Sequence, residues 1–194
     1  MNLEELHFDN GELKASAPPD HFAVFGLPRT LNLDEAELEQ DFFALSRRFH
    51  PDFFVTKSAD QQILSLKKTS ALNNAYRVLK NKISRAEYLI ELETGVAFGE
   101  SGEAKQVPTE LLSDVMEIRE RIMDFDGEDS QRAALQRDKI WAQQKQSETD
   151  TEINRIAEGW NDATKADLIS DLKDALSERR YFSGLIRDLG KASD

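Results

Sequence analysis

The chain has 194 residues, of which 39% are hydrophobic and 32% charged, and its formal net charge is −12. This length suits one medium domain or two small ones, and zero cysteines exclude disulfides, thiolate metal sites and cysteine nucleophiles while fitting a cytoplasmic protein. No apolar run approaches the roughly 18 residues of a membrane span. The acidic start "MNLEELHFDNGELK" lacks a signal-peptide pattern, so we expect neither membrane insertion nor secretion.

The charge is distributed unevenly along the chain. Residues 1–21 carry about −4, residues 22–88 about +2 and residues 89–194 about −10. Nucleic-acid binding requires a concentrated basic face, so nucleic acid is a poor partner for this chain. The asymmetry favours two modules with different partners. Glycine (9) and proline (5) are scarce while good helix formers are plentiful, which predicts an all-α fold.

Residues 1–20 are predicted to form an N-terminal extension that ends in "ASAPPD". A short helix or turn follows in "HFAVFGLP", where Gly26 and Pro28 close it. The clearest predicted helix is "LDEAELEQDFFALSRRFH", with Asp34 as its N-cap. Its apolar residues recur at 4-3-4 spacing and form one stripe, made of Leu38, Phe42, Leu45 and Phe49.

Pro51 disfavours a helical conformation at His50, so this helix is predicted to end there. A second long helix is predicted over residues 59–80, followed by a turn at "KNKIS" and a further helical segment, "RAEYLIELE". The two long helices form an antiparallel hairpin, and the short first helix can pack across it. The residues of the second helix that are predicted to face inward are Ile63, Leu64, Leu72, Ala75, Tyr76 and Leu79.

Residues 95–107 are the best candidate for a linker, because they contain three glycines within eight residues and show no apolar periodicity. They separate a predicted N-terminal domain, residues 21–94, from a predicted C-terminal domain, residues 108–190. The second domain is expected to be a three-helix bundle. Its first helix starts at Pro108 and Thr109, and its apolar positions are Leu111, Leu112, Val115, Ile118, Ile122 and Phe125.

The other two helices of the bundle are predicted over residues 130–157 and 161–189. Both show apolar residues at helical spacing, and no segment of the chain has the alternating pattern of a strand. The apolar residues are Ile140, Trp141, Ile153 and Ile156 in the first of them, and Ile169, Leu172, Leu176, Leu185, Ile186 and Leu189 in the second.

The triplet His50-Pro51-Asp52 lies in the loop of the predicted hairpin. One interpretation is purely structural, with Pro51 ending a helix and Asp52 occupying a turn. A catalytic His–Asp dyad would need a nucleophile or a bound metal, and these two side chains offer at most two ligands. The chain also lacks a GxxxxGK[ST] phosphate loop. The sequence therefore predicts no catalytic residues, no metal site and no cofactor.

An HPD triplet between two antiparallel helices, after a helix with a basic end, resembles the J-domain, a family that docks on chaperone ATPases of the seventy-kilodalton heat-shock class. More specifically, the chain is similar to the HscB family, the J-domain co-chaperones of iron–sulfur cluster assembly. The resemblance covers about residues 20–190. It is carried by "FAVFGLP" (22–28), "RRFHPDFF" (47–54), "NNAYRVLKNKISRAEYL" (73–89) and "LLSDVMEIRERI" (111–122).

The resemblance implies that His50, Pro51 and Asp52 trigger ATP hydrolysis by an HscA-type chaperone. Pro51 fixes the loop backbone at low entropic cost, and Asp52 offers a carboxylate that a partner arginine can bind with paired, charge-assisted hydrogen bonds. Arg47 and Arg48 would meet an acidic surface of the chaperone and speed the encounter. Each arginine has a plain alternative role, that of a solvated charge at a helix end.

In the family, the C-terminal module holds the iron–sulfur scaffold, a protein of the IscU type. By position, Leu112, Met116, Glu117 and Glu120 fall on the matching first helix, and Tyr181 matches an aromatic residue of the last helix. Leu112, Met116 and Glu120 are spaced by four residues and line one face. The alternative is that Leu112 and Met116 are core residues, which helical spacing alone favours.

Two residues of this helix depart from the family pattern. Ser113 stands where the family has an apolar residue, and Arg121 stands where it has an acidic one. The scaffold-binding stripe is therefore expected to be weaker here. The J-domain assignment is not affected.

The sequence thus predicts a co-chaperone without catalysis of its own, which stimulates the ATPase of an HscA-type chaperone and delivers the iron–sulfur scaffold to it. Two alternatives stay open. One is a general J-protein that serves unfolded clients, and the other is a helical adaptor in which the HPD triplet is incidental.

Overall fold

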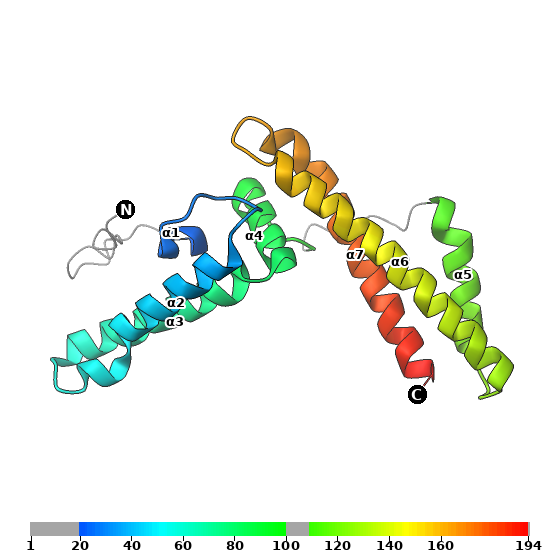
Figure 1. Ribbon diagram of the computed structural model, residues 1–194, viewed down its shortest axis with the longest axis horizontal. Helices are drawn as coiled ribbons and strands as arrows, with labels where there is room; N and C mark the ends of the chain where they lie inside the picture. The colour runs from blue at the N-terminus through cyan, green and yellow to red at the C-terminus, as the bar shows by residue number, and fades with distance from the viewer. Residues whose placement is uncertain (1–19, 100–108, 194) are drawn as a thin grey trace. The chain divides into compact units, whose positions relative to one another are not determined.

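The computed structural model describes residues 20–99 and 109–193, and these form helices and turns without any strand, which confirms the predicted all-α fold (Figure 1). The chain divides into two compact units, Met1–Leu89 and Ile90–Asp194, with the division inside α4. The helices are α1 (His21–Phe25), α2 (Glu35–Phe49), the 3-10 helix η2 (Pro51–Phe54), α3 (Ala59–Leu79), α4 (Lys82–Thr94), α5 (Thr109–Met123), α6 (Asp129–Gly159) and α7 (Lys165–Ser193).

The domain limits predicted from the sequence stay predictions. Residues 1–19 of the predicted extension and residues 100–107 of the predicted linker lie outside the described residues. No helix in the described part of the chain is long and apolar enough to cross a membrane.

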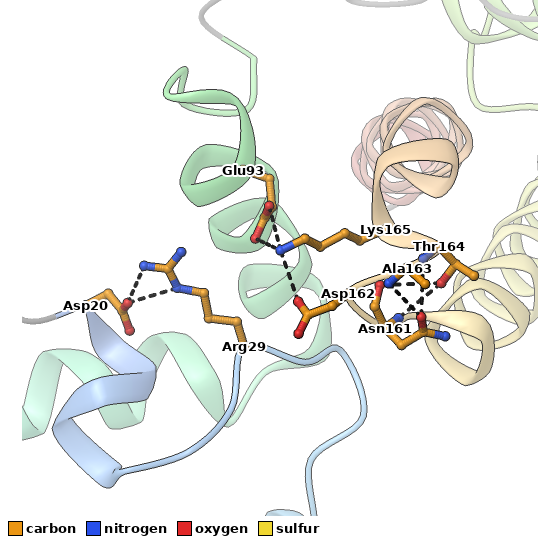
Figure 2. A network of polar contacts seen from close by, with 8 residues as sticks. All are labelled: Asp20, Arg29, Glu93, Asn161, Asp162, Ala163, Thr164 and Lys165. Carbon is orange, nitrogen blue, oxygen red and sulfur yellow. Dashed lines mark hydrogen bonds and ion pairs between the residues drawn. The ribbon is translucent and has the colours of Figure 1, made fainter.

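The first helices of unit 1 begin and end where local chemistry requires it. Asp20 caps α1 by accepting a 2.9 Å hydrogen bond from the Ala23 amide, and it also pairs with Arg29 at 2.7 Å (Figure 2). Asp34 caps α2 as predicted, because its carboxylate accepts from two first-turn amides. At the other end of α2, His50 has φ −58° and ψ 129°, an extended conformation that confirms the predicted end before Pro51.

The helices α2 and α3 run side by side as an antiparallel hairpin, and α1 packs against it (Figure 1). Leu72, Ala75 and Leu79 are buried as predicted. Ile63 and Leu64, however, are 51% and 38% exposed, so their predicted inward orientation is wrong. The buried core of unit 1 contains Phe22, Val24, Phe25, Leu31, Leu38, Leu45, Leu72, Ala75, Leu79, Ala86 and Leu89.

The period of the helix explains this error. The inward line of α3 that holds Leu72 passes through Ser65, seven residues earlier, and Ser65 is only 1% exposed. Ile63 and Leu64 precede Ser65 by two residues and one residue, which rotates them away from this line by about 200° and 100°. A polar residue thus occupies the inward position where the sequence suggested apolar ones.

Arg85 of α4 is the largest fully buried side chain of the chain's described residues. Its Nε donates a 3.0 Å hydrogen bond to the carbonyl of Leu31, and another guanidinium nitrogen donates to the carbonyl of Leu79 at the end of α3. Burial lowers the pKa of Arg85, and the charge of Glu35 opposes that shift. Arg85 therefore joins the loop before α2, the end of α3 and α4 through backbone acceptors.

Unit 2 contains the predicted three-helix arrangement. The long helices α6 and α7 pair along their length, and α5 packs on both. Ile140, one of the apolar residues of this helix, is 56% exposed, because Leu135 and Ala142 occupy the inward line of α6 and Ile140 lies about 140° from Leu135. The core that α5 shares with α6 and α7 consists of Val115, Ile118, Leu135, Ala142, Phe182, Leu185 and Leu189.

A compact turn connects α6 and α7. The side chain of Asn161 accepts hydrogen bonds from the amides of Ala163 and Thr164 at 2.9 and 3.2 Å (Figure 2). Lys165, the first residue of α7, lies 3.1 Å from Glu93 and 3.2 Å from Asp162. The hydrogen bond with Glu93, followed by that with Asp162, raises the pKa of Lys165. The turn is thus held by backbone capping and by an ion-pair cluster.

Replacing Arg85 by Met should destabilise unit 1 strongly. The substitution keeps an apolar stem but leaves the carbonyls of Leu31 and Leu79 without their donor. We expect a loss of about 2–4 kcal/mol in the free energy of unfolding, measured by urea denaturation. Arg77→Met is the matched control, because Arg77 is exposed and binds only its neighbour Asn74 at 2.8 Å among the contacts described. A control loss as large as that of Arg85→Met would contradict the assigned role.

Candidate functional site

The His-Pro-Asp loop begins directly after α2 and forms one turn of 3-10 helix. The amide of Phe53 donates to the His50 carbonyl at 3.0 Å, and the amide of Asp52 donates to His50 Nδ1 at 3.3 Å. The Asp52 carboxylate lies 3.5 Å from the same Nδ1, and its side chain is 83% exposed. The structure therefore brings the predicted residues His50 and Asp52 together, with the carboxylate open to solvent.

Basic side chains surround the end of α2. Arg47 and Arg48, both predicted site residues, are exposed in its last turn. The Arg48 guanidinium lies 5.6 Å from the centre of the Phe49 ring, and Lys68 of α3 lies 4.8 Å from the same ring. Partial burial, with a contribution from Arg48, lowers the pKa of Lys68. Sequence reasoning missed Lys68, because only the packing of α3 against α2 brings it to this position.

Three side chains of α3 bind backbone carbonyls on both sides of the triplet. Ser65 Oγ and Thr69 Oγ1 donate to the carbonyl of Phe49 at 2.7 and 3.0 Å. Gln62 Nε2 donates to the carbonyls of Val55 and Lys57, both at 3.0 Å. The loop that contains the triplet is therefore attached to α3 before and after its exposed part.

The loop also presents apolar side chains. Phe53 is 66% exposed and Val55 is 68% exposed. The rings of Phe53 and His50 are packed edge to face, with their centres 6.3 Å apart. An exposed aromatic residue beside a carboxylate and several cations is a composition that protein-docking sites favour. The accessible groups of the site suit contact with another protein surface.

The second predicted site lies on α5. Leu112 and Met116 are 44% and 59% exposed, whereas Val115 and Ile118 are buried. The alternative that Leu112 and Met116 belong to the core is therefore wrong. Met123, two turns further along the same side of α5, is 84% exposed and continues the strip. We call Leu112, Met116 and Met123 the α5 strip.

Charged residues line the α5 strip. Glu117 and Glu120 are both exposed, as a docking role requires. Arg121, the departure noted in the sequence, turns toward α6 and binds the carboxylate of Asp138 through two hydrogen bonds of 2.8 and 3.0 Å. These bonds raise the pKa of Arg121. A shallow recess beside them is lined by Glu117, Glu120, Arg121, Asp124, Gln131 and Ala134.

Tyr181 of α7 lies next to α5. Its hydroxyl accepts a 3.4 Å hydrogen bond from Arg119 Nε, and the Arg119 guanidinium lies 5.7 Å from the centre of its ring. Arg119 follows Met116 by three residues, so it lies on the side of α5 that carries the α5 strip. The structure therefore brings Tyr181 to the edge of the surface on which sequence reasoning placed it.

The hairpin with a short crossing helix and an exposed His-Pro-Asp loop, followed by a helical bundle, defines a J-domain protein with a second helical domain. Family models agree: residues 20–88 match the DnaJ domain and residues 107–190 match the HSCB C-terminal oligomerisation domain. The chain belongs to the HscB family of co-chaperones.

Individual curated relatives match somewhat more than half of this chain. The chain is 42% identical over 103 residues to the co-chaperone protein HscB homolog of Vibrio vulnificus. The aligned region covers 53% of this chain and 59% of that protein. With the homolog of Vibrio campbellii it shares 38% over 116 residues, covering 60% and 67%. The chain thus matches somewhat less than two thirds of the first of these relatives.

Solved structures of the family have the same fold. The chaperone HscB from Vibrio cholerae aligns with a TM-score of 0.63 at 25% identity, over 89% of this chain and 96% of that one. The human co-chaperone protein HscB aligns with a TM-score of 0.67 at 26% identity, over 91% of this chain and 83% of that one.

Polar substitutions in the α5 strip should leave the stability of unit 2 intact. Met116→Ser should change its free energy of unfolding by no more than about 0.5 kcal/mol, because Met116 is more than half exposed. Ile118→Ala, two residues later and buried, should cost about 2–4 kcal/mol through the cavity that it leaves. Thermal or urea unfolding measures both. A large loss of stability for Met116→Ser would contradict the assignment of this residue to the surface.

Proposed function

We propose that this protein stimulates ATP hydrolysis by an HscA-type chaperone and delivers an iron–sulfur scaffold of the IscU type to it. Membership of the HscB family supports the role of a co-chaperone. The observation that carries the proposal is the His-Pro-Asp loop itself, with its exposed Asp52 carboxylate, adjoining cations and anchored backbone.

The loop acts as a ligand for the chaperone and performs no chemistry of its own. Asp52 can accept paired hydrogen bonds from an arginine of the chaperone, and such charge-assisted bonds are the strong ones. Arg47 and Arg48 attract an acidic surface and raise the rate of encounter. Phe53 adds apolar area beside them. ATP hydrolysis takes place in the partner, whose conformation the bound loop biases.

The α5 strip is the proposed binding surface for the scaffold. Leu112 and Met116 provide exposed apolar area, Glu117 and Glu120 provide hydrogen-bond acceptors, and Tyr181 lies at the edge. Exposed apolar residues with a polar surround are typical of protein-docking sites. Because one chain would carry both binding surfaces, it raises the effective concentration of the scaffold at the chaperone.

Asp52→Asn should abolish most of the stimulation. The amide keeps the size of the side chain but carries no negative charge and only one acceptor oxygen, so it cannot form the paired ionic bonds with an arginine. We expect stimulation to fall about ten- to a hundred-fold. The measurement is single-turnover ATP hydrolysis by the cognate chaperone, with and without purified scaffold. Asp60→Asn, an exposed carboxylate in the first turn of α3, is the matched control and should retain stimulation.

The same assay separates the alternatives. Stimulation by the wild type that the scaffold increases supports a dedicated co-chaperone, and stimulation that only unfolded clients increase indicates a general J-protein. If folded wild-type protein fails to stimulate, or if Asp52→Asn is as active as the wild type, the triplet is incidental and the adaptor alternative remains.

Met116→Ser and Leu112→Ser should weaken scaffold binding while leaving stimulation by the isolated co-chaperone unchanged. Burial of each side chain at an interface contributes about 1–2 kcal/mol, so each substitution should raise the Kd of the scaffold roughly five- to thirty-fold, as measured by calorimetry. Ile140→Ser is the control, because Ile140 is 56% exposed, much like Met116, but lies on α6. Equal losses for Ile140→Ser and Met116→Ser would argue against a specific surface on α5.

A further inference from the structure

The carbonyl of Phe49 accepts two side-chain hydrogen bonds, from Ser65 and Thr69. It belongs to the last residue of α2, and carbonyls at a helix end have no partner within their own helix. Gln62, on the same side of α3, binds the carbonyls of Val55 and Lys57. These three α3 side chains therefore fix the chain directly before the triplet and again shortly after it.

The identity of the residue at position 65 points to a role in the loop. Ser65 is 1% exposed and lies on the inward line of α3, where Leu72 and Leu79 contribute apolar packing. A buried hydroxyl loses hydration, and a hydrogen bond has to compensate for that loss. The inward positions nearby, Leu72 and Leu79, need no such bond. What the hydroxyl adds is a directional bond to the residue that precedes His50.

We infer that Ser65 and Thr69, assisted by Gln62, are positioning residues that hold the His-Pro-Asp loop in its docking conformation. Between the two attachment points, residues 50–54 are restricted to the turn in which the Asp52 amide meets His50 Nδ1 and the Phe53 amide meets the His50 carbonyl. The consequence for ATPase stimulation rests on the proposed function. The consequence for the loop itself does not.

Loss of the two hydroxyls should affect affinity rather than maximal stimulation. A loop that is only partly in the binding-competent conformation binds with an affinity reduced by the competent fraction, while a saturating partner still selects that conformation. We therefore expect Ser65→Ala/Thr69→Val to raise the co-chaperone concentration needed for half-maximal stimulation about five- to twenty-fold. The maximum should stay close to that of the wild type. Asp52→Asn, which removes a contact group, should lower the maximum instead.

Hydrogen exchange in the free protein tests the positioning without any partner. In Ser65→Ala/Thr69→Val the amides of Asp52 and Phe53 should exchange at least about five-fold faster, while the amide of Leu72 in the core of the hairpin should keep its rate. Thr69→Ser retains the hydroxyl, so its loop amides should exchange at the wild-type rate, unlike those of Thr69→Val. Thr149→Val is the matched control, since Thr149 is buried and donates at 2.7 Å to a backbone carbonyl of α6.

Each outcome bears on the inference. Faster exchange confined to the loop, a raised half-maximal concentration and rescue by Thr69→Ser support it. Unchanged loop exchange, or an equal acceleration at Leu72 that reports general loosening of the hairpin, overturns it. A wild-type protein that does not stimulate the chaperone overturns the proposed function alone, because the exchange experiment still decides whether Ser65 and Thr69 position the loop.

Discussion

The contact between the end of α2 and the face of α3 is the constraint on which the loop site depends. Pro51 stops α2 at Phe49, and the freed carbonyl of Phe49 is bound by Ser65 and Thr69. Without this attachment, a loop of exposed residues would sample many conformations, and ordering it on binding would reduce affinity. A few buried polar contacts thus determine how exposed side chains such as Asp52 are presented.

Local signals in the sequence correctly predicted where helices begin and end in this molecule. The Asp34 cap and the helix end before Pro51 follow from short-range chemistry that any helix obeys, and the structure contains both. Arg85 and Ser65 donate hydrogen bonds to carbonyls that are distant in the sequence, so no local pattern predicts their roles. One signal was available for Ser65, namely its place seven residues before Leu72, on the line that faces the hairpin partner.

The helical spacing of apolar residues was the least reliable predictor of which side chains are buried. Ile63, Ile140 and Met116 each fit a helical apolar pattern, yet all three are more than half exposed. A side chain in an amphipathic helix is buried only if the neighbouring helix covers its side, and this depends on which line of residues the tertiary packing selects. For Ile63 the packing corrects a predicted inward orientation, and for Ile140 it leaves an apolar side chain outside the core. For Met116 it removes the core alternative and leaves a surface that can bind a partner.

The signs of charge on the two proposed surfaces differ, and we expect this difference to favour different partners. Arg47, Arg48 and Lys68 make the surroundings of the loop basic, whereas residues 89–194 carry about −10 and Glu117 and Glu120 flank the α5 strip. Like charges opposed across an interface cost binding energy, so a partner with an acidic docking surface is disfavoured on α5, and one with a basic surface is disfavoured at the loop. Arg121 would weaken this separation if its charge faced outward. Its two hydrogen bonds to Asp138 and its 3.7 Å ion pair with Glu117 compensate that charge, and the exposed Glu120 remains as a carboxylate beside the strip.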